Sequence, residues 1–314
     1  MIDITYVQAI LIGLLQGVTE LFPISSLGHS VLVPAWIGGD WAQLVTQYGT
    51  EDSSQSPYLS FIVALHVATA IALLAFFWRD WVNIIKAFFT TIKNRSIETS
   101  TERLAWLIIV ATIPVGITGL LFEHAVRVLF AKPFAAAAFL TLNGFILFAG
   151  EWLRRRADSR ATVEAATMTA TEVAETELDH PVVGGTNRKL ENLSFLEAGV
   201  IGLFQTAALL AGISRSGITM VGGLVRGLSH EDAAKFSFLL ATPVIFAAGL
   251  LKMPALFGPA GANIHGQVVV GAIVAGLASW FSVKFLTKYF TTRTLIPFAV
   301  YCLVFGAISL VHFA

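Results

Sequence analysis

Residues 201–228 read IGLFQTAALLAGISRSGITMVGGLVRGL, an apolar run that is interrupted in its middle by GISRSG, residues 212–217. The arm after the interruption, residues 218–228, makes only about 17 Å of helix, too little to span a bilayer core of about 30 Å. Irregular backbone at membrane depth is tolerated only where protein or a wet cavity satisfies its N–H and C=O groups. We therefore predict that region 194–229 is a re-entrant helical hairpin, which enters the membrane and returns on the same side.

A second region of the same kind lies near the N-terminus. The apolar run of residues 4–38 is interrupted by PISSLG, residues 23–28. Small and polar residues again stand where a spanning helix would have its apolar centre. We predict a second re-entrant hairpin over residues 4–38.

The rest of the chain is also suited to a lipid environment. Of the 314 residues, 56% are hydrophobic and only 13% are charged, whereas a soluble domain carries about 25% charged residues. A spanning helix needs about 20 apolar residues, and six further runs are long enough: 57–79, 104–122, 134–152, 232–252, 267–288 and 295–313. The predicted fold class is an all-α polytopic membrane protein with six transmembrane helices and two re-entrant helical hairpins.

The charged residues predict an orientation and exclude one class of partner. If the chain starts outside, nearly all Lys and Arg fall in inside segments, and only Arg127, Lys132 and Lys252 are left outside. By the positive-inside rule, both termini face out. The 20 Lys and Arg balance 20 Asp and Glu, so no basic field is available to attract nucleic acid. A single cysteine, Cys302, excludes an intrachain disulfide.

Residues 157–187 differ from the rest because they are rich in Ala, Thr, Glu and Val and contain no aromatic residue. Such a segment cannot bury enough apolar surface to offset its ordering entropy. We predict a mobile cytoplasmic linker, 153–193, between a first repeat, 1–152, and a second repeat, 194–314. A docking helix is the alternative.

The two halves resemble each other when residue i is set against residue i+189. The matches fall on the interrupted regions and include Gly13/Gly202, Gln16/Gln205, Ser25/Ser214 and Gly28/Gly217. Each half then has one hairpin and three spans, and because three is odd the halves have inverted topology. Inverted repeats with broken helices bring their polar sites together near the midplane of the bilayer.

Two charged residues stand in these hairpins, and charges at membrane depth mark functional sites because they are costly to bury. Glu20 follows Gln16 by four residues and so shares its helical face. Arg215 lies between Ser214 and Ser216. A guanidinium beside hydroxyls and the free amides of a helix start suits a phosphate or diphosphate group. The alternative is a structural ion pair, with serines that only cap helices.

The hairpin sequences resemble those of a known family. QGVTELFPISSLGH, residues 16–29, resembles the first signature of the undecaprenyl-diphosphate phosphatases of the bacitracin-resistance type, and GISRSGIT, residues 212–219, resembles their second. The resemblance covers nearly the whole chain apart from 157–187. The sequence departs from the family pattern at Leu27, where the family has Thr or Ser, at Ala211, where it has Pro, and in a longer linker.

The resemblance implies hydrolysis of undecaprenyl diphosphate to undecaprenyl phosphate and inorganic phosphate, which recycles the cell-wall lipid carrier and confers bacitracin resistance. It implies that Glu20, His29 and Arg215 are essential, with Ser26 or His29 as the nucleophile; we prefer Ser26. A divalent cation, Mg²⁺ or Ca²⁺, is expected near Glu20 and Gln16. His66 is expected to support the site. The residues expected to bind the diphosphate are Ser25, Ser214, Arg215, Ser216, Gly217 and Thr219.

The resemblance also implies a location and partners. We expect the bacterial plasma (inner) membrane, with the site opening to the periplasmic or extracellular side and the polyprenyl tail in a lipid-facing groove between the halves. The expected partners are the polyprenyl diphosphate lipid and the bilayer, while a homodimer is left open. A polyprenyl-phosphate flippase or another inverted-repeat transporter is the alternative function, because broken helices and midplane charges also serve transport.

Overall fold

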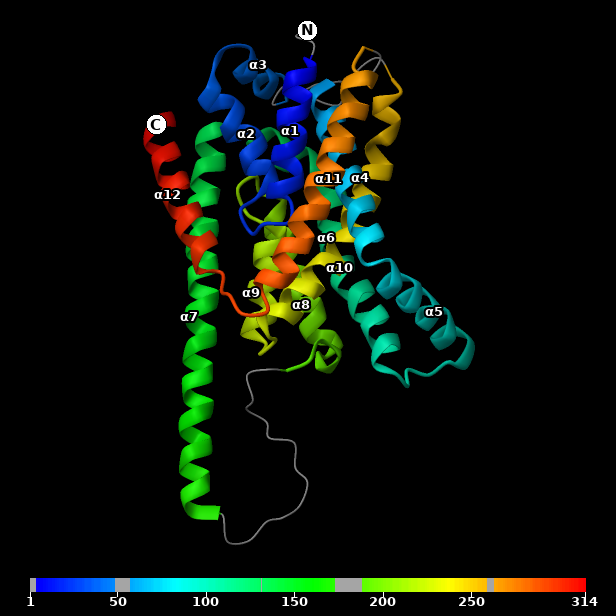
Figure 1. Ribbon diagram of the computed structural model, residues 1–314, viewed down its shortest axis with the longest axis vertical. Coiled ribbons are helices and arrows are strands. Elements are labelled where there is room, and N and C mark those ends of the chain that lie inside the picture. Colours follow the sequence, from blue (N-terminus) through cyan, green and yellow to red (C-terminus); the bar gives the residue numbers. More distant parts are fainter. Residues whose placement is uncertain (1–3, 49–56, 131, 173–187, 259–262) are drawn as a thin grey trace.

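The computed structural model describes residues 4–48, 57–130, 132–172, 188–258 and 263–314, and these residues are predominantly helical (Figure 1). The described part of the chain contains no β-strand beyond an isolated bridge between Arg188 and Leu228. The predicted all-α fold class is thus confirmed. The helices form one elongated bundle, and α7 extends beyond the others at its lower end.

Among the described residues, six helices are long and apolar enough to cross a membrane. They correspond to the six predicted spans, so that prediction is also confirmed. Their bounds are α4 Pro57–Phe76, α6 Ser100–Phe130, α7 Pro133–Glu172, α10 His230–Leu256, α11 His265–Tyr289 and α12 Ile296–Phe313.

Two pairs of shorter helices occupy the predicted hairpin regions. The first pair is α1 Tyr6–Thr19 and α2 Ser26–Ile37, and the second is α8 Phe195–Gln205 and α9 Arg215–Val225, with a 3₁₀ turn, η3 Thr206–Leu209, before the break. In Figure 1 the first pair lies in the upper half of the bundle and the second pair in the lower half. The chain therefore reverses at both predicted breaks, while passage into and out of a bilayer stays a prediction.

The start of each pair shows the internal repeat in local structure. Thr5 caps α1 and Ser194 caps α8, and each forms a reciprocal capping box, with Gln8 and Glu197 respectively. Ser194 follows Thr5 by 189 residues and Glu197 follows Gln8 by 189 residues, which is the offset that relates the two halves. Such a box satisfies two backbone N–H groups that the first helical turn leaves without a partner. The two halves thus begin their hairpins in the same way.

Each hairpin packs against a span of the other half. Helix α1 packs along α11, and α8 packs along α6. The repeat-related Gly13 and Gly202 lie at these two contacts: a Cβ on Gly13 would lie 2.6 Å from the carbonyl oxygen of Gly271, and one on Gly202 would collide with the carbonyl of Ala111. Small residues allow helix backbones to approach closely. Because each hairpin is held by the opposite half, the halves interlock.

Helix α7 runs through the first part of the predicted linker. It has 40 residues and ends at Glu172, so residues 157–172 are helical, and residues 173–187 lie outside the described residues. Adding turns to an existing helix requires no new nucleation, and alanine, frequent here, has the highest helix propensity. An ion pair between Arg155 Nε and Glu151 Oε1, 3.3 Å apart, also bridges one turn. Residues 157–172 thus continue a formed helix, while the division of the chain into two repeats and a linker stays a prediction.

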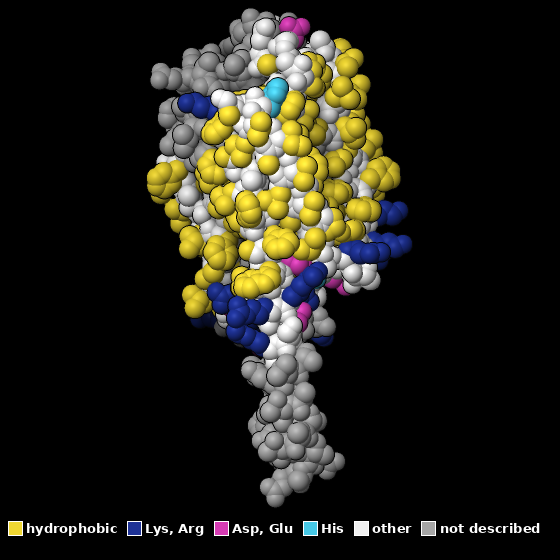
Figure 2. Space-filling view, turned by 90° about the vertical axis from the view of Figure 1, so that its left-hand side faces the viewer, with side chains coloured by type: hydrophobic (Ala, Val, Ile, Leu, Met, Phe, Trp, Pro, Cys, Tyr) yellow, Lys and Arg dark blue, Asp and Glu magenta, His cyan; other side chains and the backbone are white. Residues whose placement is uncertain are grey.

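The remaining helices lie at the two ends of the bundle. Helix α3 Gly39–Tyr48 follows α2 at the upper end, η2 Leu190–Asn192 precedes α8, and α5 Trp78–Asn94 lies beside α6 at the lower side (Figure 1). Hydrophobic side chains cover a broad band of the face in Figure 2, and most of the Lys and Arg visible there gather below this band. A charge distribution of this kind is typical of a membrane protein with one basic side.

We expect Gly202→Ala to lower the free energy of unfolding by about 1–3 kcal/mol, because an added methyl group overpacks a close helix contact. Gly199→Ala is the matched control on the same helix, since its Cβ would lie at an ordinary 3.7 Å from the Val110 side chain. Thermal unfolding in detergent measures both variants. Equal midpoints for the two would contradict the interlocked packing.

Candidate active site

The two helix breaks meet at the hydroxyl group of Ser25. Its Oγ accepts hydrogen bonds from the N–H of Gly28, at 3.2 Å, and from the N–H of Gly212, at 3.1 Å, in the other break. Ser25 has φ 70° and ψ 102°, a left-handed backbone conformation that is rare for residues with a side chain. Strained backbone of this kind persists where its surroundings fix it, and it clusters at functional sites.

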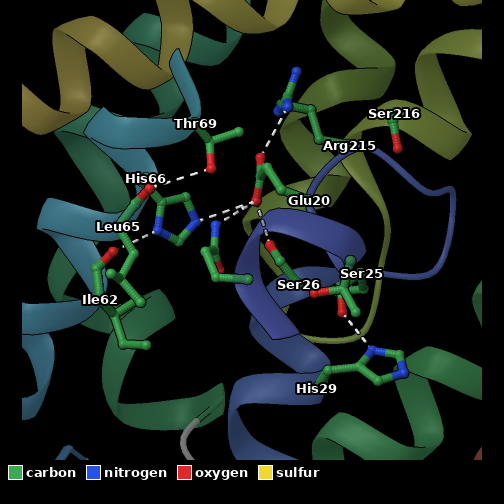
Figure 3. A network of polar contacts seen from close by, with 12 residues as sticks. Glu20, Ser25, Ser26, His29, Ile62, Leu65, His66, Thr69, Arg215 and Ser216 are labelled. Carbon is green, nitrogen blue, oxygen red and sulfur yellow. Dashed lines mark hydrogen bonds and ion pairs between the residues drawn. The ribbon is translucent and has the colours of Figure 1, made fainter. Parts of the chain in front are cut away.

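Glu20, next to this junction, is the centre of a buried polar network (Figure 3). Its Oε1 lies 2.9 Å from Arg215 Nη2. Its Oε2 lies 3.1 Å from Gln16 Nε2 and 3.3 Å from His66 Nε2, and it also accepts a hydrogen bond from the hydroxyl of Ser26. The carboxylate thereby joins α1, α2, α4 and α9. The structure brings together the predicted Gln16, Glu20, Ser26, His66 and Arg215.

Two atoms of this network lack a hydrogen-bond partner within the described part of the chain. They are Nη1 of Arg215 and Oε1 of Gln16, and both are buried. A buried polar atom without a partner costs about 1–3 kcal/mol. The Arg215 guanidinium therefore has a terminal nitrogen, Nη1, without a protein partner, while Nη2 holds Glu20.

A cavity of about 440 Å³ opens onto this network. Glu20, Ser26, His66 and Arg215 line it, as do Ser25 and Ser214 at the break. Most of its remaining wall is apolar and comes from α4, α6 and α10. Cavities of this size, mostly apolar with a few convergent polar groups, are the usual form of small-molecule sites.

His29 points away from the cavity. Its Nδ1 lies 2.7 Å from the carbonyl oxygen of Ser25, and its Nε2 lies 2.7 Å from the hydroxyl of Tyr301 on α12. Because a carbonyl only accepts, Nδ1 carries the hydrogen and Nε2 accepts from the tyrosine. Figure 3 shows His29 on the opposite side of Ser25 from Glu20. Both ring nitrogens are engaged, and the ring fixes Ser25 without reaching the carboxylate.

Three other predicted residues lie in the first turns of α9 and do not line the cavity. The hydroxyl of Ser216 donates to the carbonyl oxygen of Phe22 at 3.2 Å, the N–H of Gly217 donates to Ser214 Oγ at 3.1 Å, and the Thr219 hydroxyl donates to the Arg215 carbonyl at 2.8 Å. Of these three bonds, that of Ser216 holds the start of α9 against the first break, while those of Gly217 and Thr219 lie within the first turns of α9 around Arg215.

Sequence reasoning missed two residues that support the site, Asn143 and Tyr301. Asn143, fully buried on α7, donates from Nδ2 to the carbonyl oxygen of Pro23 at 3.0 Å and accepts at Oδ1 from the N–H of Ser214 at 3.0 Å. It thus bridges the two breaks. A lone amide within the apolar span 134–152 was the available signal for Asn143. Tyr301 had no comparable signal.

The donor set around Glu20 offers limited room for a metal ion. Within the described residues, no group of three or more His, Cys, Asp or Glu is arranged to hold one. Both Glu20 oxygens already have protein partners, and Gln16 Oε1 is the nearby oxygen that has none. Glu20 and Gln16 can therefore supply ligands to a divalent cation, but most of its oxygen ligands would come from elsewhere.

The fold and the site together define a polytopic membrane protein with a buried carboxylate–guanidinium centre between two broken helical segments. The family described as "Bacitracin resistance protein BacA" matches residues 9–308. The chain belongs to this family.

Several bacterial proteins match the chain over nearly its full length. "Undecaprenyl-diphosphatase 2" of Frankia alni is 58% identical and covers 99% of both chains. "Undecaprenyl-diphosphatase" of Mycolicibacterium paratuberculosis is 55% identical and covers 99% of this chain and 98% of its own. "Undecaprenyl-diphosphatase 1" of Frankia casuarinae is 46% identical, and the match covers 100% of this chain and 99% of its own.

We expect Asn143→Leu to lower the free energy of unfolding by about 1–3 kcal/mol, because it leaves the Ser214 N–H buried without an acceptor. Chemical unfolding in detergent measures this change. Thr141→Val is the control, since Thr141 on the same helix bonds only to its own helix carbonyl, that of Ala137, at 2.9 Å. A similar stability for both variants would show that the bridge between the breaks contributes little.

Proposed function

We propose that this chain is an integral-membrane undecaprenyl-diphosphatase, which hydrolyses undecaprenyl diphosphate to undecaprenyl phosphate and inorganic phosphate. The observation that carries the proposal is the Ser26 hydroxyl held by Glu20, beside Arg215, at the polar end of an apolar cavity. The names of the full-length relatives support it, and they do not favour the transporter alternative. The family description supports a contribution to bacitracin resistance.

The terminal phosphate of the substrate binds at Arg215. Nη1 is the free donor, while Nη2 stays on Glu20 at 2.9 Å. Ser25 and Ser214 line the same cavity and bring their helix starts to it, and the positive end of a helix dipole favours an anion there. Ser216, Gly217 and Thr219 act by holding Arg215 in place rather than by touching the phosphate.

Ser26 is the nucleophile in this proposal. Its Oγ forms a bond to the terminal phosphorus while the bond from that phosphorus to the bridging oxygen breaks. Glu20 takes the hydroxyl proton and passes it to the leaving undecaprenyl phosphate. A water molecule then attacks the phosphoserine with Glu20 as base, which releases inorganic phosphate and returns the proton to Ser26.

The two histidines have supporting parts. His66, 3.3 Å from Glu20 Oε2, orients the carboxylate toward Ser26. His29 holds the carbonyl of Ser25 and so fixes the backbone that presents the neighbouring Ser26. His29 is therefore a positioning residue, and the choice between the two nucleophile candidates falls on Ser26.

Charge balance supports a cation that enters with the substrate. Glu20 and Arg215 compensate each other's charge, so a diphosphate would bring uncompensated negative charge into a poorly solvated site. A divalent cation, Mg²⁺ or Ca²⁺, held by Glu20, Gln16 and the phosphate oxygens would neutralise that charge. Tight binding of the ion to the free protein is not expected, because the protein supplies few ligands.

The phosphate-release assay uses purified protein in detergent with undecaprenyl diphosphate. We expect Glu20→Gln, Ser26→Ala and Arg215→Lys each to lower kcat/KM by about 10²–10³-fold, as loss of a preorganised polar group does at such sites. Arg156→Gln, which alters an exposed arginine, is the control. A chelator should also stop release, and Mg²⁺ or Ca²⁺ should restore it.

Three other results of this assay would contradict particular parts of the proposal. Absence of release from folded wild-type protein would overturn the phosphatase function itself. Full activity of Ser26→Ala would exclude Ser26 as the nucleophile. Activity in chelator equal to that with Mg²⁺ would exclude the cation.

The concentration of Lys and Arg at one end of the bundle supports an orientation with that end in the cytoplasm of a bacterial cell. Both termini and the open end of the cavity then face the periplasmic or extracellular side, and the polyprenyl tail lies toward the lipid between the halves.

Labelling of introduced cysteines tests this orientation in a Cys302→Ser background. A membrane-impermeant maleimide added to intact cells or spheroplasts should label Ala314→Cys at the C-terminus and should spare Ser159→Cys on the lower part of α7. Permeabilised cells provide the control, in which both should react. The reverse pattern would invert the proposed topology.

A further inference from the structure

Helix α6 has two glycines on the wall of the cavity, one turn apart. Gly116 and Gly119 line the same space as Glu20 and Arg215. A Cβ on Gly116 would have no atom within 4 Å, and one on Gly119 would approach only the side chain of Leu209, at 3.9 Å. By contrast, Gly13 and Gly202 lie where a neighbouring helix leaves no room. Helix packing therefore does not require glycine at positions 116 and 119.

The effect of these glycines is to widen the cavity. Glycine weakens the interior of a helix relative to alanine, and neither position gains a close helix contact in return. Both positions line the cavity that Glu20 and Arg215 also line, so a side chain at either site would take up part of that space. The open wall on α6 is thus a feature of the cavity.

A buried hydroxyl independently indicates that this cavity receives a ligand. Ser30, one turn after Ser26 on α2, is 4% exposed and lines the cavity, and its Oγ has no hydrogen-bond partner within the described residues. Arg215 lines the same cavity, and its Nη1 is also without a partner within the described residues. Buried donors and acceptors are normally satisfied. Polar groups from outside the chain would give these two atoms hydrogen-bond partners.

The size of the cavity limits how much of a long lipid it can hold. About 440 Å³ lies in the range of pockets for small molecules, about 300–1,000 Å³, which suits a diphosphate and the start of a chain. At the rim, Leu120 and Leu251 are 68% and 63% exposed. The rest of a long chain would leave past these side chains into the lipid.

We propose that Gly116 and Gly119 form a subsite for the isoprene units next to the diphosphate and are specificity-determining residues for prenyl substrates. The inference rests on the proposed phosphatase function. In this proposal the methyl-branched carbon chain packs against the open wall of α6, and the polar end of the substrate lies at Arg215 and Ser26.

A graded series at one position tests the subsite. We expect Gly119→Ala to keep a KM near the wild-type value, and Gly119→Phe to raise KM for undecaprenyl diphosphate and farnesyl diphosphate about tenfold or more, a typical effect of a misfit in an apolar pocket. The value of kcat should change much less, because the reacting groups are untouched. Gly116→Leu provides a second variant that fills the same wall.

Ile117→Phe is the matched control, since Ile117 lies on the same turn and is 54% exposed on the outside of the helix. Its KM should equal that of the wild type, and thermal unfolding should show all variants folded. Wild-type KM values for both Gly119→Phe and Gly116→Leu would overturn the subsite while leaving the phosphatase intact. A wild-type protein without phosphate release would overturn the proposed function instead.

Discussion

The buried carboxylate of Glu20 is the constraint on which the rest of the structure depends. An ionised group at membrane depth must be paired and hydrogen-bonded, and the chain meets this demand with side chains from four helices: Gln16, Ser26, His66 and Arg215. Two of these partners stand at the starts of α2 and α9, so satisfying Glu20 requires both breaks to come together. The pairing that removes the cost of burying the charge also assembles the groups that chemistry on a phosphate would need.

The interlocked packing of the two halves gives this centre a rigid support. Each hairpin lies along a span of the opposite half, α1 on α11 and α8 on α6, so neither half can withdraw without opening two helix contacts. Inside this frame, Asn143 and the Ser25 hydroxyl each bond to both breaks. Preorganised groups of this sort keep a reactive geometry within tight limits. The unusual backbone of Ser25 is maintained because its hydroxyl and its carbonyl are both held.

The sequence predicted the features that follow from composition and local pattern. The six spans, the two breaks and the meeting of Glu20 and Arg215 in one site all depend on apolar length, on small polar interruptions or on the cost of isolated charge. The direction of His29 could not be read in this way, because its spacing from Ser25 fits both a catalytic and a supporting position, and the partner that distinguishes them, Tyr301, is 272 residues away. Asn143 did have a signal, as a lone amide in an apolar span, but its partners Pro23 and Ser214 are distant in the sequence. The extension of α7 to Glu172 could not be read from composition, because adding turns to a helix depends on the helix that precedes the segment.

The exposed Leu120 and Leu251 at the rim of the cavity, where we propose that the prenyl chain leaves, have a consequence for the substrate concentration that the enzyme senses. A molecule that enters past these side chains arrives by lateral diffusion within one leaflet. The relevant concentration is then a mole fraction among the surrounding lipids, and the volume of the aqueous phase has no bearing on it. Adding inert lipid or detergent at constant total substrate would slow turnover by surface dilution. In a cell, the rate would follow the local crowding of the leaflet.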